Sequence, residues 1–222
     1  TLRDYAPVGA AWWLSAPSPL QRDDYLAQRE HAKRLARAGV VDSGRALTAI
    51  ARRQATAVRK HILERVRRRD ATGGYVVTGW RDTPITTSGM VDDALELKFD
   101  PEAWRAFNAD RILIIDRERR RLWEGGDRPS PREPYTFWAR ESAELNLALA
   151  NGADATAAGW LSWRVRTIEG AVVVASRFAT AGVPAGLTRS LGVIDLTLPN
   201  ATAPTALWFE AEWAGADSVI TN

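Results

Sequence analysis

Trp80, Arg81 and Asp82 form the best local set of side chains for binding a ligand. An indole can stack on the apolar face of a sugar ring, while a guanidinium and a carboxylate can hydrogen-bond its hydroxyl groups. The same residues have a plainer interpretation, in which Asp82 caps the following loop and Trp80 packs beneath it. The residues alone leave both interpretations open.

Other kinds of site find less support in the sequence. His31 and His61 are the only histidines, and neither has a partner at the spacing of metal ligands or of a Ser/His/Asp triad. The chain has no cysteine and no Gly-rich phosphate loop. We therefore expect no metal and no cofactor. Glu64 lies on an arginine-rich helix, where pairing on the surface with a residue one turn away explains it more simply than catalysis does.

Composition and charge narrow the choice of partners. The 222 residues are 45% hydrophobic and 26% charged, which suits one or two soluble globular domains, and the net charge is only +3. The basic run from Arg52 to Arg69 has no interleaved aromatic residues, which favours a solvated helix face over a nucleic-acid interface. No apolar run approaches the roughly 20 residues of a membrane helix. We expect neither nucleic acid nor membrane as a partner, and the compartment, cytoplasmic or exported, stays open.

Three helices are expected in the first half of the chain. Ser18-Pro19 starts one that stops at Gly39, and Asp42 or Ser43 caps a second. Asp100-Pro101 starts a short third one, which carries Trp104 and Phe107. Apolar residues in the second helix recur at steps of three and four, so the pattern predicts a buried stripe with the arginines facing water. The stripe comprises Leu47, Ile50, Ala51, Ala55, Val58, Ile62 and Val66.

Strands follow the second helix. Tyr75–Thr78 is a run of β-formers too apolar to be half exposed, which indicates a buried parallel strand fed by the helix before it. From Arg111 onward, short apolar runs alternate with clusters of turn residues, which is typical of an antiparallel sandwich. The expected strands are 112–115, 135–138, 145–149, 160–166, 172–174, 193–198 and 207–213. The tryptophans of this half mostly fall on strands and are expected to pack in the core; they include Trp123, Trp138, Trp160, Trp163 and Trp213.

Two pairs of segments resemble glycoside hydrolase family 2, a member of clan A. Gly74-Tyr-Val-Val-Thr-Gly-Trp-Arg-Asp82 with Gly89-Met-Val-Asp92 resembles the last strand of the catalytic barrel. Residues 160–166 with Leu191-Gly-Val-Ile-Asp-Leu-Thr-Leu-Pro199 resemble the β-sandwich that follows it. The resemblance implies an α+β chain, with the terminal segment of a (β/α)8 TIM barrel in residues 1–108 and an immunoglobulin-like antiparallel β-sandwich in residues 109–222. A whole barrel takes about 250 residues, so the remainder would come from an upstream segment or a companion chain.

The resemblance also implies an activity, the retaining hydrolysis of β-linked glycosides. Retaining enzymes use two carboxyl groups about 5 to 5.5 Å apart, and in this family both would lie upstream of Thr1. We therefore expect no catalytic residue in this chain and no activity from the isolated chain. Trp80, Arg81 and Asp82 would contact the carbohydrate substrate at the end of the last strand. Trp12 and Trp13, which follow the seventh strand by the resemblance, would line the same cleft.

Two alternatives come from other classes. Residues 112–116 followed by 122–125 also resemble a strand, turn and strand of extracellular or periplasmic sensor domains. A stand-alone carbohydrate-binding module, a sandwich with a helical prefix, is the other. Two cleft glutamates in an upstream segment would favour the enzyme, and a flanking membrane helix would favour the sensor. The absence of an initiator Met at Thr1 suggests a piece of a longer protein. The sequence does not give the sugar, the linkage or the oligomeric state.

Overall fold

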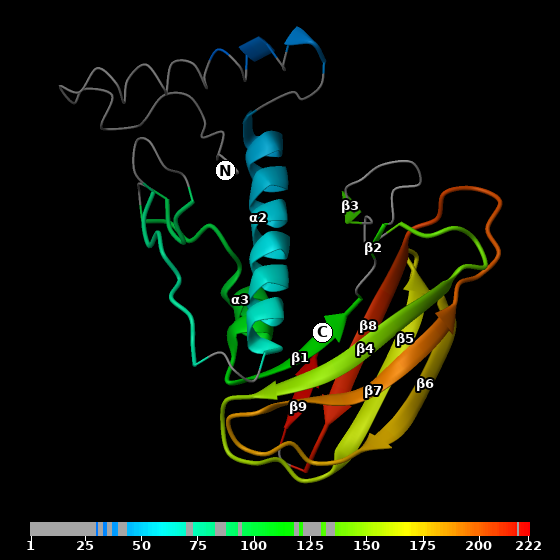
Figure 1. Cartoon of the computed structure of the whole chain (residues 1–222). Coiled ribbons are helices and arrows are strands. Elements are labelled where there is room, and N and C mark those ends of the chain that lie inside the picture. Colours follow the sequence, from blue (N-terminus) through cyan, green and yellow to red (C-terminus); the bar gives the residue numbers. More distant parts are fainter. Residues whose placement is uncertain are drawn as a thin grey trace. The chain divides into compact units, whose positions relative to one another are not determined.

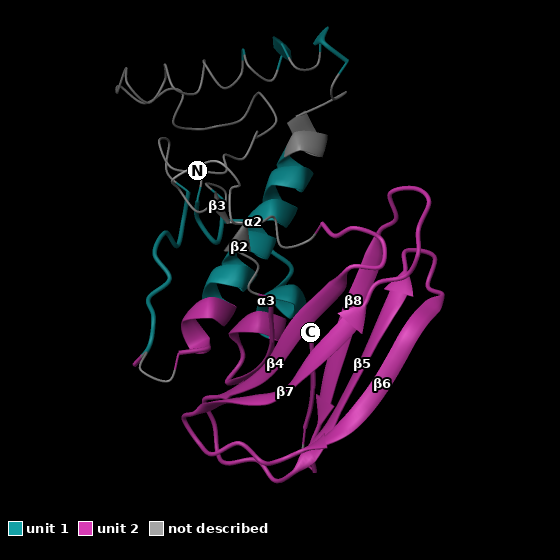
Figure 2. Ribbon diagram, turned by 45° about the vertical axis from the view of Figure 1, so that its right-hand side comes forward, with its two compact units in different colours: residues 1–63, 74–105 teal, residues 64–73, 106–222 magenta. Residues whose placement is uncertain are grey.

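The chain contains two compact units, coloured separately in Figure 2. Unit 1 comprises residues 1–63 and 74–105, and unit 2 comprises residues 64–73 and 106–222. Helices α2 (Gly44–Arg67) and α3 (Pro101–Asn108) contribute residues to both units. The computed structural model describes residues 30, 33–34, 37–39, 44–69, 73–82, 88–92, 95–117, 120–121, 130–131, 136–216 and 218–222.

Unit 2 is built on two antiparallel sheets, which Figure 1 shows as two layers. One sheet has the order β1-β4-β7, with β1 at Arg111–Asp116, β4 at Ser142–Asn151 and β7 at Thr188–Thr197. The other has the order β6-β5-β8-β9, with β6 at Val172–Thr180, β5 at Gly159–Thr167, β8 at Leu207–Ala214 and β9 at Val219–Thr221. A small ladder joins β2 (Arg120–Arg121) to β3 (Ser130–Pro131). The two main sheets are consistent with the expected β-sandwich.

The core of the sandwich follows the alternation in the sequence. Leu161 and Val165 of β5 are buried, and the intervening Arg164 is exposed. Leu145, Leu147 and Leu149 of β4 belong to the same apolar cluster as these two residues. Five expected strands correspond to β1, β4, β5, β6 and β7, and a sixth to β8. The expected strand at 135–138 is wrong where it is described, because residues 136–138 form no ladder, and β9 was not predicted.

The tryptophans of unit 2 divide into two groups. Trp213 is 1% exposed and donates from Nε1 to Thr180 Oγ1 at 2.9 Å, and the partly buried Trp163 stacks on Phe209. For these two, the prediction of core packing is confirmed. It is wrong for Trp160 and Trp138, which are 51% and 84% exposed. Trp123 lies outside the described residues. The errors arise because a strand has two faces and Trp160 lies on the one that points away from the core.

Helix α2 confirms the predicted second helix but not the face it buries. Ile50, Val58 and Ile62 are exposed, whereas the predicted stripe member Ala51 is buried, as is Leu63. Arg52 and Arg59, expected in water, are partly buried, and so is Arg68. The buried Glu64 accepts a hydrogen bond from Asn222 Nδ2 at 2.8 Å, so its expected surface position is also wrong. The side chain of Leu47 lies outside the described residues.

The predicted buried strand at Tyr75–Thr78 is wrong. Residues 73–79 form no ladder with any described residue, and Val76 is 87% exposed. The structure therefore contains no barrel segment that can be recognised as such among its described residues.

The flanking helices of unit 1 follow the sequence more closely. Helix α3 begins as predicted, with Asp100 Oδ1 accepting from the Glu102 amide and Phe107 buried. The predicted first helix is helical at the described positions 30, 33, 34 and 37, and Gly39 takes a φ of 69° at its expected end. The caps at Ser18, Asp42 and Ser43 lie outside the described residues. No helix in the described ranges is both long and apolar enough to cross a membrane.

Candidate functional site

The candidate site is the turn region of unit 1 that joins residues 79–82 to residues 88–92. The amide of Asp82 donates to the Val91 carbonyl at 3.0 Å, and the amide of Val91 donates to the Trp80 carbonyl at 3.0 Å. These bonds form an isolated parallel bridge between Arg81 and Val91, and Val91 makes an antiparallel bridge to Leu97. A Cβ on Gly89 would lie 2.5 Å from the Asp82 amide nitrogen, so only glycine fits there. The Gly-x-x-Asp element at residues 89–92 thus lets two backbone segments meet.

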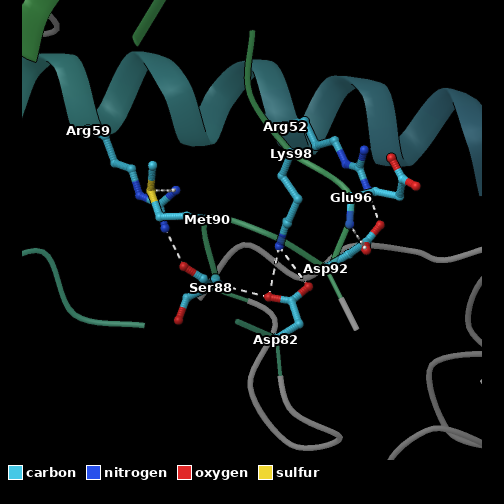
Figure 3. A network of polar contacts seen from close by, with 9 residues as sticks. Arg52, Arg59, Asp82, Ser88, Met90, Asp92, Glu96 and Lys98 are labelled. Atoms are coloured by element: carbon cyan, nitrogen blue, oxygen red, sulfur yellow. Dashed lines mark hydrogen bonds and ion pairs between the residues drawn. The ribbon is translucent and has the colours of Figure 1, made fainter. Parts of the chain in front are cut away.

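Asp82 is buried, and Figure 3 shows its carboxylate facing the Lys98 side chain. Its Oδ1 accepts from the Gly89 amide at 2.7 Å, and both carboxylate oxygens accept from Lys98 Nζ, at 3.1 and 2.9 Å. The Lys98 and Asp82 side chains are only 4% and 7% exposed. A buried carboxylate needs such partners, because an uncompensated charge away from water is unfavourable. Asp82 therefore fixes the turn through contacts within the protein.

Two arginines of α2 extend the polar network (Figure 3). Arg52 Nη2 lies 3.5 Å from Asp92 Oδ2, and Asp92 Oδ1 accepts from the Glu96 amide at 2.9 Å. Arg59 donates to the Ser88 carbonyl and lies with its guanidinium carbon 4.5 Å from the centre of the Phe99 ring. Burial lowers the pKa of the Arg59 guanidinium from its usual value, and the Asp82 charge partly opposes this shift. These contacts explain why the arginine side of α2 is partly buried.

Trp80 and Arg81 have a different environment from that of Asp82. Trp80 is 71% exposed, and Arg81 is exposed as well, so both side chains reach solvent beside the turn that Asp82 holds. An exposed indole next to a guanidinium can stack on an apolar ring face and donate to hydroxyl groups. Trp12 and Trp13 lie outside the described residues. The assignment of Trp80, Arg81, Asp82, Trp12 and Trp13 to substrate binding stays a prediction.

Sequence reasoning did not predict the contacts that Lys98 and Arg59 make with this turn. Lys98 is one of only three lysines in an arginine-rich chain, which was the one available signal of a special position. A lysine places a compact charge between two carboxylate oxygens, whereas arginine presents a planar fork. No group of three or more His, Asp or Glu side chains able to hold a metal ion occurs within the described ranges.

The chain matches no protein-family model and no curated protein. The class of protein therefore has to be argued from the residues and their geometry.

Proposed function

We propose that this chain is the C-terminal portion of a retaining glycoside hydrolase of the family 2 type, acting on β-linked glycosides. The catalytic carboxylates belong to a part of the enzyme outside these residues. In this proposal Trp80 stacks on a sugar ring, Arg81 hydrogen-bonds its hydroxyls, and Asp82 positions both by holding the turn. The observation that carries the proposal is the exposed Trp80-Arg81 pair beside a turn fixed by the buried Asp82–Lys98 ion pair.

The exposed valines before Trp80 also support the proposal. Val76 and Val77 are 87% and 42% exposed, although valine is a residue that normally lies in strands and away from water. Residues 73–79 form no ladder with the rest of the described chain. In this proposal the segment becomes a barrel strand only when neighbouring strands are supplied from elsewhere. An upstream segment or a companion chain would supply those strands.

The test compares the 222-residue chain with the product of the longest open reading frame that contains it. Both are assayed against a panel of nitrophenyl β-glycosides. We expect turnover only from the longer product, and we expect Trp80→Ala to lower its kcat/KM by roughly five- to tenfold through lost stacking. Trp138→Ala, which removes a more exposed tryptophan from unit 2, serves as the matched control.

Turnover by the 222-residue chain, abolished by a change at one of its own Asp or Glu residues, would contradict the proposal. A Trp80→Ala variant that retains full activity in the longer protein would contradict the assignment of Trp80 to substrate binding, without bearing on the fold. Thermal unfolding of each variant separates the two roles of this region. A loss of activity at unchanged stability indicates substrate contact, whereas a parallel loss of both indicates packing.

A further inference from the structure

The four-stranded sheet of unit 2 has an outer face, made of the side chains of β5, β6, β8 and β9 that point away from the apolar core. In β5 this face carries Trp160, Ser162, Arg164 and Arg166, because these alternate with the core residues. The strand register places Trp160 beside Ala214, and Arg166 beside Trp208. Figure 2 shows β5, β6 and β8 as one layer of this unit. The residues that share the face are thus fixed by strand pairing.

Two tryptophans lie at opposite ends of the outer face. Trp160 is 51% exposed and Trp208 is 56% exposed. Arg166, the neighbour of Trp208, lies six positions after Trp160 in β5, which corresponds to about 20 Å along the strand. Indoles are normally at least partly covered in a folded protein. Two exposed indoles on one face, at this separation, are suited to a ligand that has flat apolar surfaces at intervals.

The surface between the two indoles carries charged side chains and is hollowed. Arg164 and Arg166 donate to the two carboxylate oxygens of Glu210, at 2.6 and 2.5 Å. The hydrogen bond from Arg164, followed by that from Arg166, holds the pKa of Glu210 below its usual value. A hollow of about 690 Å³ lies over these strands, within the usual size range of ligand pockets. Its lining includes Ser162, Arg164, Ala175, Arg177, Glu210 and Glu212.

The charges on this face argue against two other occupants. Glu210 already pairs with two of the arginines, and Glu212 adds a second negative charge, which disfavours a nucleic-acid backbone. The guanidinium carbon of the third arginine, Arg177, lies over the Trp160 ring, 5.1 Å from its centre, so this cation is also engaged within the protein. A protein partner would favour a continuous apolar patch, and here a charged strip divides the two indoles. The ligand that suits this face is therefore an uncharged, hydroxyl-rich chain, which would stack on the two indoles and hydrogen-bond to the charged side chains between them.

We propose that the outer face of this sheet binds an extended, uncharged oligosaccharide, with Trp160 and Trp208 as stacking platforms and the Arg164–Glu210–Arg166 group as the hydrogen-bonding centre. This site is made of residues of unit 2 alone, whereas Trp80 belongs to unit 1. It does not depend on the proposed glycosidase activity. A single sugar ring is too short to reach both indoles, so the site favours linear oligomers over monosaccharides.

The experiment is titration calorimetry of the full chain with cellohexaose, xylohexaose and mannohexaose, and with the corresponding monosaccharides. We expect one hexasaccharide to bind and its monosaccharide to bind far more weakly. Trp160→Ala and Trp208→Ala should each weaken binding by roughly five- to tenfold, while Trp160→Phe should retain most of it. Trp138→Ala is the matched control, because this tryptophan is 84% exposed and does not belong to the outer face.

A second variant covers the case in which a tryptophan variant fails to fold. Ala175→Arg places a long side chain in the hollow from an exposed position, and it should abolish binding while the circular dichroism stays unchanged. Failure of all three hexasaccharides to bind the folded chain would overturn the proposal. So would equal losses in Trp138→Ala and Trp160→Ala. Hexasaccharide binding is judged from Trp160→Ala and Trp208→Ala, and the proposed hydrolase site from kcat/KM of the longer protein, so the two proposals can fail independently.

Discussion

Trp213 in unit 2 and Asp82 in unit 1 are both buried, but different forces hold them. The Trp213 ring lies in a cluster of apolar side chains drawn from both sheets, with a single hydrogen bond to Thr180. Asp82 instead depends on Lys98 and the Gly89 amide. Apolar packing is spread over many weak contacts, whereas an ion pair away from water fails when one partner is removed. The comparison predicts that unit 2 responds to lost volume and unit 1 to lost charge.

The largest expected effect is that of Trp213→Ala. Removing this side chain leaves a cavity between the sheets, which should cost about 3 to 5 kcal/mol in the free energy of unfolding. Gly159 and Gly215 lie against its ring, and a Cβ on either would approach ring atoms within 3 Å, so the backbone is already fitted to the indole. Denaturant unfolding followed by circular dichroism measures the loss. Trp138→Ala should change the same free energy by less than about 0.5 kcal/mol, and equal losses would contradict the assignment of the core.

Lys98→Met tests the buried Asp82–Lys98 ion pair of unit 1. It leaves the Asp82 carboxylate buried without its cation, which should cost about 3 kcal/mol or more. Hydrogen exchange should show the loss as faster exchange of the Gly89 and Val91 amides, which this region holds in hydrogen bonds. Adding Asp82→Asn should restore much of the protection, because the amide oxygen still accepts from Gly89 and no lone charge remains. Unchanged protection in the single variant would mean that the ion pair does not hold the turn.

Neighbouring positions on α2 provide a sharper contrast. Leu63 is 6% exposed and Ile62 is 51% exposed. Leu63→Ala should therefore destabilise by about 2 kcal/mol or more, and Ile62→Ala by less than about 0.5 kcal/mol. Thermal unfolding of the two variants decides between this face and the one that periodicity predicted. A larger loss at Ile62 would restore the sequence-based interpretation.

The smallest expected effect concerns pH. The folded-state pKa of Glu210 lies below its unfolded value, so its stabilising pairing is present above the unfolded pKa and is lost as pH falls through the folded one. Glu210→Gln should therefore lower Tm slightly at pH 7 and narrow the difference between Tm at pH 7 and at pH 3. Because the ion pairs of Glu210 with Arg164 and Arg166 are on the surface, 0.5 M salt should reduce the change in Tm. An effect that grows on acidification would contradict the sign.

Local patterns were enough to predict much of the secondary structure. Helix α2 was predicted from its cap and from apolar residues at steps of three and four, α3 from Asp100-Pro101, and the alternation in β5 from its period of two. Which side of α2 is buried was not predictable in the same way. Arg59 extends its stem along Phe99 and reaches the Ser88 carbonyl, so an arginine occupies a position that hydrophobicity assigned to water. The candidate site shows the same contrast. Residue type was enough to single out Trp80 and Asp82 as candidates, but it did not predict that Lys98 pairs with Asp82.

The sequence by itself determined that the chain has a helical first part and a β-rich second part, because helix and strand periods are properties of neighbouring residues. Tertiary structure decided everything that joins distant residues. It set the sheet orders β1-β4-β7 and β6-β5-β8-β9 and left Trp160 and Trp208 on one exposed face. It also paired Asp82 with Lys98 across sixteen positions. The physical reason is that burial and charge compensation depend on which side chains meet in space, and local sequence does not contain that information.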